Sequence, residues 1–284
     1  MAATTAVNIM AVIANFLARS STTVVISERS PIEASSVDAS KTSRLYRRLI
    51  PVVYPRASKI VAVSYGVADE LTGKFQIDSS LVSVIYNPVV SEEIDKLRNK
   101  PVEEPWFEET EVPVILAVGR LHPAKDFSTL INGFAILRSQ IAARLIILGE
   151  GRCRQNLQKQ IDELGIQDSV RMPGFVSNPY AYMSKAKVFA MTSVYEGICN
   201  VLIEALACGC PVVATNCTGG GPREILEDGK WGTLIPTQDP KRLSEALATT
   251  LKSQHASEAC KKRAAFFSVE NGLDNYEKLF STLT

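Results

Sequence analysis

Two glutamates, eight positions apart, stand in a stretch that otherwise has the composition of a buried core. Glu196 and Glu204 lie in "YEGICNVLIEALACGCPVVAT" (195–215), where nearly every other residue is apolar or small. Burying a carboxylate without a partner costs on the order of several kcal/mol. We therefore expect each glutamate to have a partner. A structural Arg or Lys would serve, and so would the hydroxyl groups of a bound sugar; the residues alone leave both alternatives open.

The segment between the two glutamates predicts the start of a helix. Asn200 is expected to be the N-cap, and Gly209 followed by Pro211 ends the helix, which would span about 201–208. The free amides and positive dipole end near Gly197 favour an anion. One glutamate on each side of an anion site could grip a sugar on one side and a ribose on the other.

Two cations five positions apart, Arg120 and Lys125, occur in "GRLHPAKD" directly after a predicted strand. Arginine offers a planar fork of donors and lysine a point charge, and together they suit a diphosphate. The alternative is a solvated loop with ordinary surface charges.

Strands and helices alternate through the second part of the chain, which indicates a doubly wound parallel sheet. Such sheets bind ligands beyond the carboxyl ends of their strands. Glycine follows most of the predicted strands and allows a close backbone approach to a ligand there. The strands are expected within residues 112–119, 143–149, 169–176, 187–193, 211–215 and 231–236.

A boundary stands out at 99–112, a segment rich in proline and acidic residues that we interpret as a linker. It separates a first lobe, 1–98, from a second lobe, 113–266. A terminal helix at 267–284 either crosses back to the first lobe or stays on the second. In the first lobe we expect a core helix near residues 1–20, then strands within 22–27, 59–64 and 81–88.

The composition narrows the function classes. The 284 residues are 46% hydrophobic and 21% charged, with a net charge of +1, so nucleic acid is not an expected partner. No run of 18 apolar residues predicts a membrane span, and the first residues lack the basic start of a signal peptide. The segment 43–56, with arginines among apolar residues, is a candidate for contact with a membrane surface or a solvated, domain-facing stretch.

The six cysteines have mostly apolar neighbours, and Cys208 and Cys210 have the wrong spacing for a CxxC pair. With only two histidines, no zinc site is expected. We interpret the cysteines as buried thiols in a reducing cytoplasm.

Several segments resemble the nucleotide-sugar-dependent retaining glycosyltransferases of family 4, which have the two-lobed fold called GT-B. The segments are "AVGRLHPAKDFSTLI", "LIILGEG", "VRMPGFV" and "YEGICNVLIEALACGCPVVATNCTGGGPREIL", with weaker likeness in "YPRASKIVAVSYGVADEL" and "VIYNPV". The resemblance covers about 112–284. It implies an α/β fold of two Rossmann-like lobes with parallel sheets, the first lobe incomplete because the usual opening strand and glycine-rich loop are missing.

The resemblance also implies a role for each matching residue. Arg120 and Lys125 would hold the donor diphosphate, Glu196 the hydroxyls of the donor sugar, and Glu204 the ribose. Arg120, Lys125 and Glu196 are thus the expected catalytic residues. The expected donor-binding residues, several of them acting through the backbone, are Gly119, Gly149, Glu150, Val176, Gly197, Ile198, Cys199, Asn200, Val201 and Glu204.

The implied reaction moves a hexose or N-acetylhexosamine from a nucleoside diphosphate, with UDP favoured, to a glycan or lipid-linked acceptor with retention of configuration. No Asp-x-Asp triplet occurs, so neither a metal nor another cofactor is expected. The expected location is the cytoplasm, with the inner face of the membrane as a peripheral site.

Two alternatives stay open. One is a nucleotide-sugar-binding module that is inactive alone and needs a partner chain for the missing half-lobe; self-association would fit the same picture. The other is a different reaction on the same fold, such as that of a phosphorylase or sugar epimerase.

Overall fold

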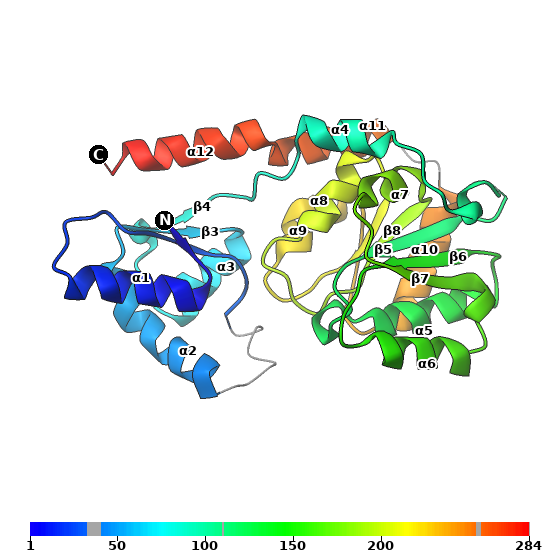
Figure 1. Ribbon diagram of the computed structural model, residues 1–284, viewed down its shortest axis with the longest axis horizontal. Coiled ribbons are helices and arrows are strands. Elements are labelled where there is room, and N and C mark those ends of the chain that lie inside the picture. The colour runs from blue at the N-terminus through cyan, green and yellow to red at the C-terminus, as the bar shows by residue number, and fades with distance from the viewer. Residues whose placement is uncertain (33–40, 110, 254–256, 284) are drawn as a thin grey trace.

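The chain forms two α/β lobes that lie side by side, each built on one parallel sheet (Figure 1). The computed structural model describes residues 1–32, 41–109, 111–253 and 257–283. Every strand pair within both sheets is parallel. The predicted α/β class with two Rossmann-like lobes is therefore confirmed.

The second lobe holds a six-stranded sheet in the order β10-β9-β8-β5-β6-β7. All six strands overlap the segments predicted from the sequence. They are β5 (Val114–Val118), β6 (Arg144–Leu148), β7 (Val170–Gly174), β8 (Val188–Met191), β9 (Val212–Thr215) and β10 (Thr233–Ile235). The helices are α5 (Phe127–Arg138), α6 (Arg154–Glu163), α7 (Pro179–Lys185), α8 (Asn200–Ala207), α9 (Gly221–Ile225), α10 (Pro240–Lys252) and α11 (Ser257–Ala264).

Helices cover both faces of this sheet, which is why its strands are nearly continuous apolar runs. Alternate residues of a strand point to opposite faces. Ile115 of β5 belongs to a buried cluster with residues of α5, α6 and α10, whereas its neighbour Leu116 belongs to another with residues of α7 and α8.

The first lobe has a four-stranded sheet in the order β1-β2-β3-β4. The strands are β1 (Ala2–Ala3), β2 (Val25–Glu28), β3 (Lys59–Ala62) and β4 (Val82–Val84), with the helices α1 (Thr5–Leu17), α2 (Lys41–Val53) and α3 (Tyr65–Asp69). The two-residue β1 was not expected, because two alanines carry no strand pattern.

The first helix differs from its prediction as a core helix. α1 buries Asn8, Ile9 and Val12, but Met10 and Phe16 are 60% and 62% exposed. Since only one side of α1 faces the sheet, the other side leaves apolar residues at the surface.

The interpretation of 99–112 as a simple linker is only partly right. Helix α4 (Glu92–Arg98) packs on α7, and the Asn178 side chain donates a hydrogen bond of 2.9 Å to the Leu97 carbonyl. Trp106 is 6% exposed, and the Arg171 guanidinium lies 4.2 Å from the centre of its ring. The chain therefore joins the second lobe before α4, and a buried aromatic fixes the segment that follows; Thr110 lies outside the described residues.

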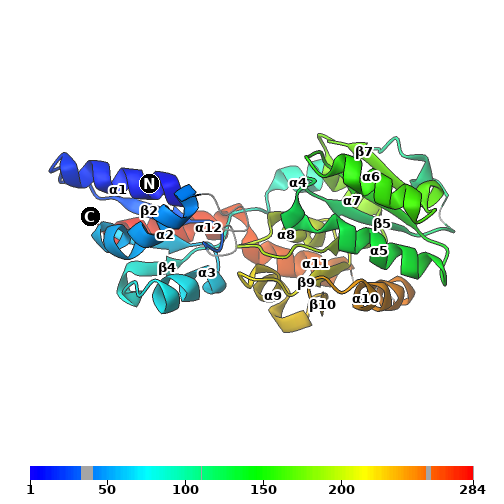
Figure 2. The same cartoon turned by 90° about the horizontal axis from the view of Figure 1, so that it is seen from below.

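Helix α12 (Val269–Ser281) returns to the first lobe and runs along it, as Figures 1 and 2 show. Leu279 packs with Val25, Val61 and Ile85 of the first lobe. The last helix thus ties the two lobes together.

Candidate active site

A cavity of about 450 Å³ lies beyond the carboxyl ends of β5, β6 and β7. Its walls include five predicted residues: Gly119, Arg120, Gly149, Glu150 and Val176. The remaining lining residues are Val118, Leu148, Phe175, Ser177 and Pro179. The structure thus brings these five expected donor-site residues into one pocket, with the exposed Arg120 on its wall.

Glycine is required in the wall of this cavity. Gly149 has a φ of 134°, and a Cβ there would lie 2.0 Å from the carbonyl oxygen of Gly119. The two loops can touch at this point only because Gly149 carries no side chain. Glu150 pairs with Arg154 at 2.9 Å while its side chain stays about half exposed, so its carboxylate remains at the cavity wall.

Lys125 and Glu196 form an ion pair between the loop after β5 and the loop after β8. Their side chains are 25% and 15% exposed. Ser193 donates a further hydrogen bond of 2.8 Å to the same carboxylate. Burial by itself lowers the pKa of Lys125, but the negative charge around it and its bond to Glu196 outweigh burial and leave the pKa raised.

The sequence left two kinds of partner open for each buried carboxylate, a structural cation or the hydroxyls of a sugar. The partner of Glu196 within the chain is a lysine, which was the structural alternative. The two roles are compatible, because a carboxylate has about four acceptor positions and an ammonium has three donors. Lys125 can therefore hold Glu196 and a phosphate oxygen together.

The ion pair lies beside the 450 Å³ cavity. A Cβ at Gly119 would lie 3.6 Å from Cε of Lys125, so the lysine stem passes along the loop that lines the cavity. Arg120 and Lys125, five residues apart in sequence, are thus held on one short turn, with Lys125 closing the 3-10 helix Pro123–Lys125.

The second glutamate, Glu204, has a tyrosine as its partner. Burial raises the pKa of Glu204, and a hydrogen bond from Tyr180 partly offsets the rise. Burial and the nearby Glu204 raise the pKa of Tyr180 to about 12. Tyr180 follows Pro179, which lines the cavity, so the partner of Glu204 is next in sequence to a residue of the cavity wall.

The start of α8 differs from its prediction. Asn200 is the first helical residue and Cys199 the cap, without a side-chain cap bond. The Asn200 side chain instead accepts a hydrogen bond of 2.8 Å from Asn87 of the first lobe. Ile198 and Cys199 are buried, so they can offer a ligand only their backbone. The first amides of a helix have no acceptor inside it, which leaves those of Asn200 and Val201 for an anion.

The first lobe contacts the second lobe directly beside the start of α8. A Cβ at Gly197 would lie 2.4 Å from the carbonyl oxygen of Arg29, so the lobes touch backbone to backbone. Glu224 of α9 accepts hydrogen bonds from the backbone amides of Tyr65 (2.9 Å) and Gly66 (2.8 Å), at the start of α3. The carboxyl ends of the two sheets therefore face each other.

Sequence reasoning missed three of these residues. Ser193 has a weak signal, three positions before Glu196 at the end of a strand. Tyr180 and Glu224 have none, since their partners lie far away along the chain.

Among the described residues, no group of three or more His, Cys, Asp or Glu side chains is placed to hold a metal ion. That turnover needs neither a metal nor another cofactor stays a prediction. None of the helices in the described ranges is long and apolar enough to cross a membrane.

Solved structures share this architecture. The crystal structure of Anabaena Alr3699/HepE in complex with UDP has a TM-score of 0.81 and 24% identity, over 98% of this chain and 77% of that one. The structure of the same protein in complex with UDP-glucose has a TM-score of 0.79 and 23% identity, with the same coverage. The two facing lobes have the GT-B fold of glycosyltransferases.

The family follows from the sequence profiles. The profile described as Glycosyl transferases group 1 matches residues 100–266, more than half of the chain, and the chain belongs to this family. The profile Glycosyltransferase Family 4 matches residues 3–93. A relative from Campylobacter jejuni, the N-acetylgalactosamine-N,N'-diacetylbacillosaminyl-diphospho-undecaprenol 4-alpha-N-acetylgalactosaminyltransferase, is 33% identical over 243 residues. The match covers 86% of this chain and 64% of that protein.

Proposed function

We propose that this protein transfers a sugar from a nucleoside diphosphate sugar to a hydroxyl of a glycan or lipid-linked acceptor, with retention of configuration. UDP is the favoured nucleotide, and a hexose or N-acetylhexosamine the favoured sugar. The observation that carries the proposal is the Lys125–Glu196 ion pair beside a glycine-walled cavity that Arg120 lines. The named relative and the UDP-bound structures support it.

The donor fits the site in three parts. The base occupies the 450 Å³ cavity against the backbone of Gly149 and Val176. The ribose hydroxyls donate to Glu204, which Tyr180 orients. The diphosphate lies between Arg120, Lys125 and the first amides of α8, where two cations and a helix start favour negative charge.

The reaction breaks the bond between the anomeric carbon and the diphosphate oxygen, and the electron pair leaves with the diphosphate. The acceptor oxygen bonds to the anomeric carbon on the same face and gives its proton to the departing diphosphate. Arg120 and Lys125 stabilise the charge that develops on the leaving group. Glu196 keeps Lys125 in place and accepts hydrogen bonds from the donor sugar.

We further propose that the protein acts without a metal or other cofactor, in the cytoplasm and at the inner face of the membrane. A membrane surface there would present a lipid-linked acceptor. The alternative is a binding module that needs a partner chain. Turnover by the chain alone would favour the transferase, and its absence would favour the binding module.

The test is the release of free UDP from UDP-glucose and UDP-N-acetylgalactosamine, with and without saccharide acceptors. Glu196→Gln should lower turnover by about 10²-fold or more, as expected when a group that positions transition-state charge is lost. Glu163→Gln is the matched control, because Glu163 is 65% exposed and pairs with Lys159 on the surface of α6. Unchanged turnover in a folded Glu196→Gln variant would refute the site assignment. UDP binding without turnover in the native chain would favour the binding module.

A further inference from the structure

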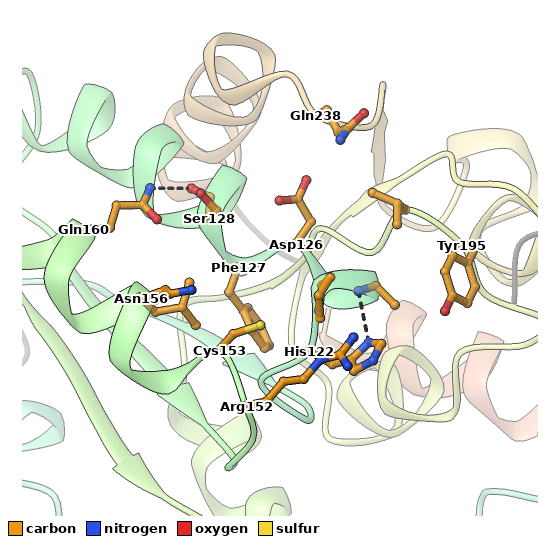
Figure 3. Close-up of a pocket in the computed structure, with 14 residues that line it drawn as sticks. His122, Asp126, Phe127, Ser128, Arg152, Cys153, Asn156, Gln160, Tyr195 and Gln238 are labelled. Carbon is orange, nitrogen blue, oxygen red and sulfur yellow. Dashed lines mark hydrogen bonds between the residues drawn. The ribbon is translucent and has the colours of Figure 1, made fainter. Parts of the chain in front are cut away.

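A second cavity, of about 530 Å³, lies on the same lobe and has no lining residue in common with the first (Figure 3). Its walls come from the loop after β5, the starts of α5 and α6, the loop after β8 and the segment after β10. All of these follow the carboxyl ends of strands. The cavity therefore lies at the edge of the sheet that faces the first lobe.

Sequence neighbours of Lys125 and Glu196 line the cavity. Ala124 and Asp126 flank Lys125, Tyr195 precedes Glu196, and all three line the cavity. The amide of Val194 donates a hydrogen bond of 2.9 Å to the Ala124 carbonyl, which joins the two loops. Residues that line this cavity are thus the sequence neighbours of both members of the proposed catalytic pair.

The lining combines an apolar floor with planar polar groups. Phe127 and Leu157 are buried and form part of the floor. Asn156 and Gln238 add carboxamides to the lining, and the ring of Tyr195 lies on the opposite side from Asn156 (Figure 3). Gln160 also lines the cavity, but its Nε2 already donates hydrogen bonds to the Ser128 carbonyl (3.0 Å) and to Asn132 (2.8 Å). A sugar ring has apolar C–H faces and a rim of hydroxyls that both donate and accept, so it matches such a lining.

The charge of the lining favours a neutral ligand. Arg152 and Asp126 are its one arginine and its one carboxylate, and they offset each other. His122 accepts a hydrogen bond of 3.2 Å at Nδ1 from the amide of Ala124. A phosphate or nucleotide would need a surplus of cations, which this lining does not have. The volume lies within the range of roughly 300–1,000 Å³ of small-molecule sites.

We propose that the 530 Å³ cavity binds a neutral sugar unit of the acceptor, so that the second lobe holds part of the acceptor as well as the donor. The inference rests on the proposed transferase function. Lys125, to which the proposed function assigns the donor diphosphate, does not line this cavity, which leaves the acceptor as the saccharide for it.

The probes are two neutral disaccharides, maltose and N,N'-diacetylchitobiose, titrated by saturation-transfer NMR with and without UDP. Asn156→Trp places a large ring at the cavity and Asn156→Ala removes one carboxamide. Gln158→Trp and Gln158→Ala are matched controls on the same helix, because Gln158 is exposed, does not line the cavity and donates to Asp162 at 3.0 Å. Melting curves of all variants check the fold.

We expect at least one disaccharide to bind the native chain, about tenfold or more weakly to Asn156→Trp and about threefold to tenfold more weakly to Asn156→Ala. The Gln158 variants and the UDP affinity of every variant should not change. Binding that survives Asn156→Trp, or no binding of either disaccharide by the native chain, would overturn the inference. Failure of the proposed transferase function has separate signs: a folded native chain that binds no nucleoside diphosphate, or one that binds UDP but releases none from the UDP-sugars.

Discussion

The Lys125–Glu196 ion pair should contribute measurably to stability even without a ligand. Replacing Glu196 by Gln keeps the shape of the side chain and its bond from Ser193, but it leaves the Lys125 charge without a counter-charge. Lys125→Met removes the cation and keeps most of the apolar stem. The double variant completes a cycle that isolates the pairwise term.

The expected coupling follows from how buried the pair is. Breaking a fully buried pair costs about 3–5 kcal/mol, and exposed pairs are worth about 0.2–1 kcal/mol. With side chains 25% and 15% exposed, we expect a coupling of about 2 kcal/mol, between these limits. Because the folded pKa of Lys125 is raised, the lysine's share of this contribution is present below the unfolded lysine pKa of about 10.4 and is lost as pH rises through the folded pKa. It is therefore fully present at neutral pH.

Urea unfolding of the four proteins at neutral pH measures the coupling, provided that the slope m stays constant. The surface pair Lys159–Glu163, 3.6 Å apart and largely exposed, is the control and should give about 0.5 kcal/mol or less. A coupling at the Lys125–Glu196 pair no larger than that of the control would show that the ion pair does not hold the two loops together, and the reasoning would be wrong.

Three further predictions concern the fold around the site. Gly197→Ala should separate the lobes, because its Cβ would lie 2.4 Å from a backbone oxygen of the first lobe. The radius of gyration measured by X-ray scattering should therefore rise. The control Gly73→Ala should not change it, because a Cβ there meets nothing within 4 Å. Trp106→Ala should lower the free energy of unfolding by about 3–5 kcal/mol in urea, because Trp106 is buried; a loss below about 1 kcal/mol would contradict its anchoring role. Burial raises the pKa of Glu28, so the native chain loses stability as pH rises from the unfolded glutamate pKa of about 4.3 through the raised folded pKa. Glu28→Gln should therefore gain stability relative to the native chain as pH rises above about 4.3. A constant difference in urea midpoints would contradict this.

The second lobe could be predicted closely because its signals are local. β5 and β6 are apolar runs covered by helices on both faces, and the glycines that follow them mark places where loops approach each other. Each of these patterns lies within a few consecutive residues. Because the strands are parallel, their carboxyl ends then meet at one edge of the sheet.

The parts that could not be predicted depend on contacts between distant residues. Asn200 has the right chemistry for an N-cap, but its side chain binds Asn87 of the other lobe instead. Tyr180 reaches Glu204 from a neighbouring helix, and Glu224 caps a helix of the first lobe. The sequence of α4 does not show which lobe it belongs to. Its place on the second lobe comes from its packing on α7.

The most direct test of the central claim, that the second lobe binds a nucleoside diphosphate at Arg120, is calorimetric titration of the native chain with UDP, GDP and ADP. The account predicts binding, tightest for UDP. It also predicts a loss of about tenfold or more in Arg120→Ala, since a hydrogen bond to a charged group is worth about 1.5–3 kcal/mol. The control Arg242→Ala, an exposed arginine of α10 paired with Glu245, should bind UDP like the native chain. Equal UDP affinity in Arg120→Ala and Arg242→Ala, or no binding of any of the three nucleotides by the folded native chain, would contradict the account.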